Sequence, residues 1–134
     1  MTSPHNLLNP STLAKPVGFT HAVIAAKGRT IYLGGQAAHD GKGQIVGSST
    51  AEQFARAAAN VVLTLDAAGA KPEHLVSMQI FVTDVAEYRA SLPELATAYQ
   101  DHFGRHYPAI ALMEVGGLFD PAAKVELVCI AVVP

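Results

Sequence analysis

The stretch LVSMQIFVT, residues 75–83, alternates between two kinds of side chain and lies between two helical patterns. Its even positions are all apolar, whereas its odd positions include Ser77, Gln79 and Thr83. Alternation with a period of two predicts a strand whose two faces meet different surroundings. A strand with a helix on each side in the sequence is typical of a sheet that contains parallel neighbours.

A helix is predicted before this strand, over residues 50–68. Thr50 to Gln53 fits a capping box, in which a hydroxyl and an amide satisfy free N–H groups of the first turn. Gly69 and Pro72 end the pattern. The helix carries one apolar stripe, which consists of Phe54, Ala58, Val61, Leu65 and Ala68.

A second helical region is predicted after the strand, over residues 84–103. Pro93 interrupts it and suits the first turn of a fresh helix. Gly104 ends the region. Its apolar stripe consists of Leu92, Leu95, Tyr99 and Phe103.

The remaining strands are predicted outside the helices. Residues 19–26 and 29–38 read as a hairpin about Lys27-Gly28, and residues 44–46 add a short strand. Two strands close the chain, at 109–115 and 124–133. We therefore predict one α+β domain over residues 1–134, in the order β-β-β-α-β-α-β-β, with two helices on one face of a mixed sheet. Residues 1–18 are expected to form an extended arm.

The composition indicates that part of the surface does not face water. Apolar residues make up 50% of the chain and charged residues only 15%, against about 25% charged in average soluble domains. The final strand is apolar on both faces, so two helices on one side leave the other face uncovered. We expect another subunit to cover it; the alternative is a compact monomer of low charge.

Charge and cysteine content restrict the partners and the compartment. The net charge is −2 and the Lys and Arg residues are scattered, which argues against nucleic acid and against an anionic membrane. No apolar run approaches the ~20 residues of a membrane span, and the first residues do not resemble a signal peptide. A cytoplasmic protein is expected. The single Cys129 excludes an intrachain disulfide and is expected to be an inert core thiol.

No strong catalytic motif is present, and the candidate residues are few. His102 and His106 have helical metal-ligand spacing, but Gly104 lies between them and no third ligand is evident. No metal and no other cofactor is therefore expected. Gly34 and Gly35 lie inside a strand pattern, where glycine indicates either tight packing or a pocket floored by bare backbone.

Two acids, Glu114 and Glu126, lie in strands that are otherwise aliphatic. If the last two strands pair as a hairpin about residue 120, these acids lie near each other. Two close carboxylates in a dry place raise one pKa, which suits proton transfer. The alternative is that each acid is paired or hydrogen-bonded at a subunit boundary, or lies at an exposed strand end.

The chain resembles the Rid family, the reactive intermediate deaminases also known as the YjgF family. The resemblance rests on short motifs whose order and spacing span nearly the whole chain. They are PVGFTHAV, IYLGGQ, Q-F-x-x-A-x-x-N-V (53–61), L-x-A-A-G-A (65–70), F-V-T-D-V (81–85), Y-x-x-x-F (99–103), YPAIALMEV (107–115) and K-V-E-L-V-C-I-A-V (124–132).

The resemblance implies a chorismate-mutase-like subunit that assembles as a homotrimer with ligand clefts between neighbouring subunits. It also implies hydrolysis of reactive enamines and imines to a 2-keto acid and ammonia. In the family, an arginine of the P-A-R motif holds the substrate carboxylate as a bidentate pair. A glutamate on the last strand positions or activates the attacking water.

These family residues are only partly present here. Glu126 matches the water-positioning glutamate, but Ile110 takes the place of the arginine. Phe19 stands where tyrosine is usual, Gly34 where serine is usual, and Ala96 about where asparagine is frequent. A charge-assisted hydrogen bond to a carboxylate contributes about 1.5–3 kcal/mol. Its loss is expected to disfavour the standard 2-imino acids.

The other candidates have smaller expected roles. Gly35 is expected to shape the ligand pocket together with Phe19, Gly34, Ala96 and Ile110. Arg105, in a predicted loop, is the alternative source of a guanidinium group. Glu114 is expected to be structural.

Three functions remain open at this point. The first is a divergent hydrolase whose substrate lacks a carboxylate or is more apolar. The second is a trimer that binds a small metabolite or a protein partner without turnover. The third is RNA cleavage, an older family label, which the acidic pI and the absence of a basic patch disfavour.

Overall fold

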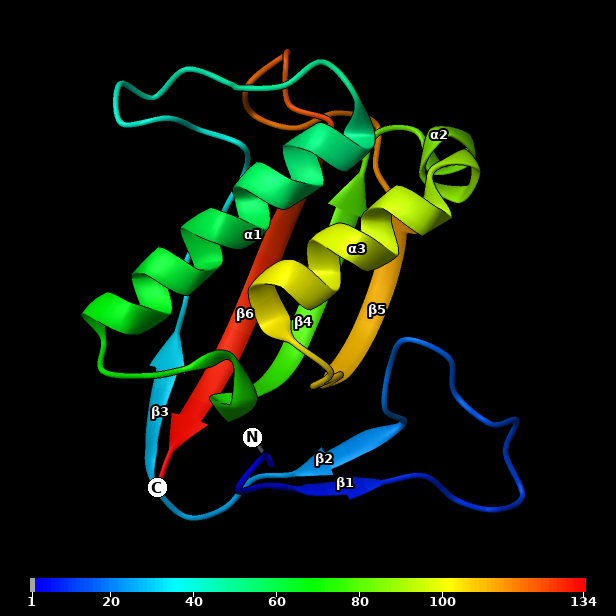
Figure 1. The fold of residues 1–134 in the computed structure, drawn as a ribbon, viewed down its shortest axis with the longest axis vertical. Coiled ribbons are helices and arrows are strands. Elements are labelled where there is room, and N and C mark those ends of the chain that lie inside the picture. Colours follow the sequence, from blue (N-terminus) through cyan, green and yellow to red (C-terminus); the bar gives the residue numbers. More distant parts are fainter. Residues whose placement is uncertain (1) are drawn as a thin grey trace.

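The computed structural model describes residues 2–134 and has the predicted mixed α+β fold (Figure 1). β4 and β5 are parallel, and the other neighbouring strands of the main sheet are antiparallel. The order across this sheet is β3 (Arg29–Tyr32), β6 (Val125–Val133), β4 (Leu75–Val82) and β5 (Ala109–Glu114).

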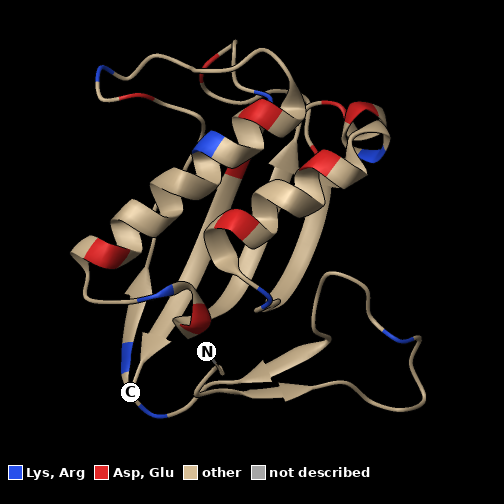
Figure 2. Ribbon diagram, in the orientation of Figure 1, with Lys and Arg blue, Asp and Glu red and all other residues tan. Residues whose placement is uncertain are grey.

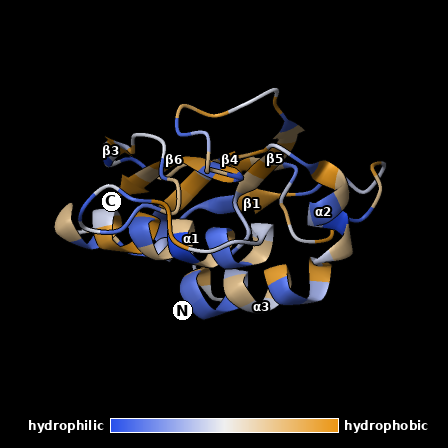
Figure 3. Ribbon diagram, turned by 90° about the horizontal axis from the view of Figure 1, so that it is seen from above, coloured by the Kyte–Doolittle hydropathy of each residue, from blue (hydrophilic) through white to orange (hydrophobic). Residues whose placement is uncertain are grey.

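The helices connect the strands and lie together on one face of the main sheet (Figure 3). α1 (Thr50–Ala67) leads through the 3-10 turn η1 (Pro72–His74) into β4. α2 (Val85–Ala90) and α3 (Leu92–Phe103) make the crossover from β4 to β5. The break between α2 and α3 falls at Ser91, which confirms the predicted interruption near Pro93.

The start of α1 is capped one residue earlier than the sequence pattern suggests. The N-cap is Ser49 and not Thr50, because the Ser49 hydroxyl accepts the Glu52 N–H at 3.1 Å. The Glu52 carboxylate accepts the Ser49 N–H in return, at 3.2 Å. Gln53 turns inward, where its side-chain carbonyl accepts the Lys124 N–H at 2.7 Å and ties α1 to the start of β6.

The core lies between the main sheet and the pair α1 and α3. Burial raises the pKa of the Cys129 thiol to about 12, which agrees with the predicted inert core thiol. The opposite face of β6 carries Glu126, Val128 and Ile130, which are only half-buried. The side chains of β6 that point to the helices are buried, namely Val125, Leu127, Cys129 and Ala131.

The strands on either side of Gly28 do not form the predicted hairpin. β2 (Ala22–Ile24) pairs with β1 (Asn6–Leu8) in a separate two-stranded sheet, and β3 pairs with β6. A Cβ at position 28 would overlap the backbone of Val133. The glycine is therefore explained by the close approach of two chain segments and not by a tight hairpin turn.

The structure also differs from the predictions for two short segments. The predicted arm contains β1, a strand that the sequence pattern did not indicate because it is short and exposed. Residues 44–46 do not form a strand, and Ile45 makes only an isolated bridge to His39.

The predicted hairpin between the last two strands is wrong, because β4 lies between β5 and β6. Glu114 is opposite Val82 and Glu126 is opposite Phe81, on the two edges of β4. The long connection from residue 115 to residue 124 crosses the end of β4, so the two acids do not face each other across a ladder.

Candidate functional site

A pocket of about 260 Å³ lies where residues 19–21 cross the first halves of β4 and β5. The first three residues of β5 therefore contribute one wall. The pocket is lined by three segments, which are Phe19, Thr20 and His21; Ser77, Met78 and Gln79; and Ala109, Ile110 and Ala111.

Thr20 fixes the first of these segments to β5. Its N–H donates to the Pro108 carbonyl at 3.0 Å, and its hydroxyl donates to the Tyr107 carbonyl. Thr20 also forms a parallel bridge with Ala109. Thr20 is buried, so its polar groups serve the fold and are not exposed to a ligand.

Ile110 and Phe19, two of the residues suggested by the family motifs, line this pocket together. Ile110 is opposite Met78 of β4 and is partly buried against the core. The residues that line the pocket include no Lys, Arg, Asp or Glu. A carboxylate in this pocket would meet no guanidinium or ammonium group among them, which makes its desolvation unfavourable.

Glu126 lies outside this pocket, on the uncovered face of the main sheet. Its carboxylate packs directly over Gly35, and a Cβ at position 35 would overlap it. The bare backbone of Gly35 therefore makes room for the acid. Gln79 of the pocket is opposite Val128, so its side chain lies on the same face of the sheet as Glu126, whereas Ile110 is opposite the buried Met78 and packs against the core.

Three further candidates lie away from the pocket. Gly34 is exposed, and a Cβ there would meet no atom within 4 Å. Ala96 is exposed on α3. Glu114 accepts the N–H of Val85 at 2.9 Å, so its carboxylate contacts the start of α2.

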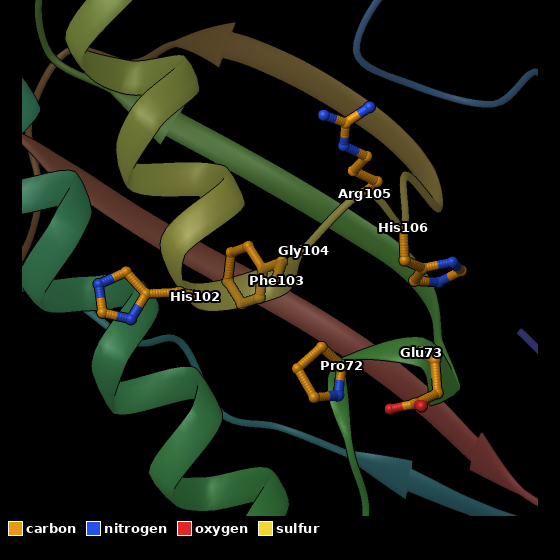
Figure 4. A pocket seen from close by; sticks show the side chains of 7 residues that line it. All are labelled: Pro72, Glu73, His102, Phe103, Gly104, Arg105 and His106. Atoms are coloured by element: carbon orange, nitrogen blue, oxygen red, sulfur yellow. The ribbon is translucent and has the colours of Figure 1, made fainter. Parts of the chain in front are cut away.

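Arg105 lines a different hollow, of about 190 Å³, at the end of α3 (Figure 4). The side chain of Arg105 points away from Pro72 and Glu73 on the other side of this hollow (Figure 4). The pocket beside Ile110 does not include Arg105. The structure therefore does not bring this guanidinium group to the place of the missing arginine.

His102 and His106 lie on different sides of the end of α3 (Figure 4). His106 is buried, and its Nε2–H donates to the Leu75 carbonyl at 2.8 Å. Burial lowers the pKa of His106 below its ordinary value. Among residues 2–134, no three His, Cys, Asp or Glu side chains are grouped so that they could hold a metal ion.

Four polar residues of the pocket were not predicted from the sequence, namely Thr20, His21, Ser77 and Gln79. The alternation of residues 75–83 placed Ser77 and Gln79 on the polar face of a strand. No sequence pattern indicated that residues 19–21 meet that face, because this contact joins segments far apart in the chain.

Comparisons with known proteins agree with this architecture. A family model described as endoribonuclease L-PSP matches residues 11–133. A goat (Capra hircus) 2-iminobutanoate/2-iminopropanoate deaminase is 30% identical over 105 residues, which cover 78% of this chain and 73% of the goat protein. No helix among residues 2–134 is long and apolar enough to cross a membrane.

Two solved structures are similar to this chain over most of their length. YyfB of Yersinia pestis, a Rid-family protein of unknown function, is 28% identical with a TM-score of 0.87, over 96% of this chain and 98% of YyfB. Rv2704 of Mycobacterium tuberculosis, from the YjgF/YER057c/UK114 family, is 27% identical with a TM-score of 0.65, over 87% and 88% of the two chains. The chain therefore belongs to the endoribonuclease L-PSP family, the YjgF/Rid family whose motifs its sequence resembles.

Proposed function

We propose that this chain hydrolyses reactive imines or enamines that carry no carboxylate, producing a carbonyl compound and ammonia. The observation that carries the proposal is the Glu126 carboxylate, which lies over the bare backbone of Gly35 on an otherwise aliphatic strand. Within residues 2–134 no hydrogen bond or ion pair engages this carboxylate. It is therefore available to accept a proton from water. The activity of the goat relative supports a C=N substrate.

The pocket supports the restriction to substrates without a carboxylate. Ile110 and Phe19 provide apolar walls, and the lining includes no Lys, Arg, Asp or Glu. Binding a 2-imino acid there would place an anion against apolar surface without a cationic partner. An uncharged imine avoids this cost.

The chemistry requires one water and no redox partner. Glu126 accepts a proton from water as the water oxygen bonds to the carbon of the C=N group, and the imine nitrogen takes up a proton. In the resulting amino alcohol the hydroxyl gives up its proton and the amino nitrogen takes up one, so that a C=O bond forms as the C–N bond breaks and ammonia leaves. Imine and water are thus converted to a carbonyl compound and ammonia.

We also propose that the working unit is a homotrimer with this site between neighbouring subunits. The uncovered face of the main sheet carries the half-buried Val128 and Ile130, and Tyr32 of β3 is 77% exposed. Another copy that covers this face would shield these side chains from water. It would also enclose Glu126 and the pocket.

The proposal is tested by measuring ammonia release from two kinds of imine. Uncharged imines released by a flavin amine oxidase are expected to be hydrolysed faster in the presence of the protein. The 2-iminobutanoate released by a threonine dehydratase is expected to show no acceleration. Glu126→Gln is expected to abolish the first activity. Robust hydrolysis of 2-iminobutanoate, or full activity of Glu126→Gln, would overturn the proposal.

A non-catalytic trimer that binds a small metabolite is the second candidate, and the absence of a cation in the pocket favours it equally. In that case no imine is hydrolysed, while ligand binding survives the Glu126→Gln change. RNA is a weaker candidate as a partner. Figure 2 shows Lys and Arg on separate elements and loops and not gathered on one face.

A further inference from the structure

We propose that His21 determines the specificity of the pocket, and that it selects an uncharged ligand that donates a hydrogen bond, such as an imine or amide N–H. The proposal rests on the proposed function in one respect, because it assumes that the substrate occupies the pocket beside Ile110. His21 is then the group that recognises the substrate, in place of the arginine that the family motif has at position 110.

Three contacts hold the His21 residue in one orientation. Its Nε2–H donates to the Ala14 carbonyl at 2.9 Å, and its backbone N–H donates to Oδ1 of Asn9 at 2.9 Å. The ring of Phe19 meets it edge-on, with centroids 5.1 Å apart and planes at 81°. A side chain that is fixed in this way loses little further freedom when a ligand binds.

These contacts leave one atom of the His21 ring, Nδ1, free to form a further hydrogen bond. A carbonyl oxygen only accepts hydrogen bonds, so the proton of the neutral imidazole lies on Nε2 and Nδ1 carries a lone pair. No hydrogen bond to Nδ1 is formed within residues 2–134. Because His21 is among the residues that line the pocket, this unused acceptor is the one that the proposed ligand would engage.

The other available polar groups of the pocket are uncharged. Ser77 and Gln79 point to the same face of β4, and their side chains make no hydrogen bond within the described part of the chain. Thr20 is already engaged by the Tyr107 carbonyl. The pocket thus presents an imidazole, a hydroxyl and an amide between apolar walls. This set matches a small neutral ligand with both donor and acceptor groups.

The proposal is tested with two probes of the same size, propionamide and propionate. Each is added to ¹⁵N-labelled protein, and the amide resonances are followed by NMR. Propionamide is expected to give saturable shifts at His21, Ser77, Gln79 and Ala111, whereas propionate at the same concentration gives none. Equal responses to the two probes, or no saturable response to either, would contradict the proposal.

Two substitutions separate the two nitrogens of His21. His21→Gln retains a donor for the Ala14 carbonyl but lacks the acceptor at Nδ1, so propionamide affinity is expected to fall about tenfold or more. His21→Asn retains an acceptor near the Nδ1 position, so selection of propionamide over propionate is expected to persist. His39→Gln, outside the pocket, serves as the control. Unchanged affinity of His21→Gln would overturn the assignment.

Binding and turnover are measured separately, so the two proposals fail in different ways. If propionamide is selected through His21 but no imine is hydrolysed, the proposed hydrolase is wrong and the role of His21 stands. If uncharged imines are hydrolysed equally well by His21→Gln, the role of His21 is wrong and the hydrolase stands.

Discussion

Gly34 and Gly35 are adjacent in the chain but have different surroundings. A Cβ at position 35 would overlap the Glu126 carboxylate, whereas one at position 34 would meet nothing within 4 Å. Gly35→Ala is therefore expected to displace the acid and to weaken imine hydrolysis, with only a small loss of stability, because the overlapping atoms belong to the movable end of the Glu126 side chain. Gly34→Ala is the matched control and is expected to change stability little. Urea unfolding and the imine assay measure both effects. Equal behaviour of the two variants would contradict the packing of Glu126 over Gly35.

Ile110 is the residue whose replacement should change substrate choice. Ile110→Arg supplies a guanidinium at the place the family motif expects one, and is expected to give measurable hydrolysis of 2-iminobutanoate in the dehydratase-coupled assay. Because Ile110 is partly buried against the core, the variant is also expected to be less stable. Ile110→Leu controls for the change of side chain. A folded but inert Ile110→Arg would show that more than the anchor is missing.

At the residue scale, the sequence motifs identified two residues that line the pocket but not the long-range contacts that assemble it. Phe19 and Ile110 were identified from motifs, and they line one pocket. His21 was not identified, because its role depends on Asn9, Ala14 and a strand start far along the chain. Such contacts leave no local periodicity in the sequence.

At the scale of elements, the first turn of α1 depends on Ser49. Ser49→Ala removes the hydroxyl that accepts the Glu52 N–H, and is expected to cost about 1 kcal/mol of stability. Thr97→Ala, which changes an exposed hydroxyl within α3, is expected to have a smaller effect. Thermal and urea unfolding of both variants provide the measurement, and a larger loss for Thr97→Ala would be inconsistent with the cap.

The carboxylate of Glu87 joins α2 to the first residue of α1 and to the residue that precedes β6. It accepts the N–H of Thr50 at the start of α1, and the ammonium of Lys124 lies 2.9 Å away. Hydrogen bonds from Thr50 and Lys124 lower the pKa of Glu87 from 4.5 to about 2. Because the folded pKa lies below the unfolded value, this contribution to stability is present above pH 4.5 and is lost as the pH falls towards 2.

Glu87→Gln is therefore expected to lower stability at neutral pH by about 1 kcal/mol, since the group is partly exposed to solvent. The variant should also lose less stability than the unchanged protein when the solution is acidified below pH 4.5. Urea unfolding across this range tests both points, with Glu94→Gln on α3 as the control. Parallel pH profiles for the two proteins would show that Glu87 does not contribute.

Strand pairing was the weakest part of the prediction at this scale. Helices and strands were recognised by their periods, and the break before Pro93 by the chemistry of proline. The turn-rich connection after β5 suggested a hairpin, but β4 pairs with both β5 and β6. The residues of a loop do not determine whether another strand lies between the two strands that the loop connects.

At the scale of the whole molecule, the uncovered face of the main sheet is expected to hold the subunits together. Val128→Asp places a charge on that face and is expected to reduce the assembly to smaller species, because an unpaired charge is costly in a dry interface. Leu63→Asp is the control, since Leu63 is 68% exposed on the helical side. Analytical ultracentrifugation of the two variants measures the change. An unaltered Val128→Asp assembly would mean that another face is used.

The overall architecture was largely predictable, and for two separate reasons. The periodicities of residues 50–68, 75–83 and 84–103 predict helices and strands in a βα order, and the motifs predict the family. The low content of charged residues adds that part of the surface does not face water. The arrangement of β1 and β2 apart from the main sheet was not predictable, because both strands are very short.

The loop that carries His21 also lies along an edge of the main sheet. β5 is an edge strand, and an open edge offers its backbone groups to any extended chain, which promotes aggregation. The bridge from Thr20 to Ala109 occupies the beginning of this edge. The segment that covers this edge is thus the same one that is proposed to select the ligand, so substitutions in residues 19–21 are expected to affect both aggregation and ligand choice.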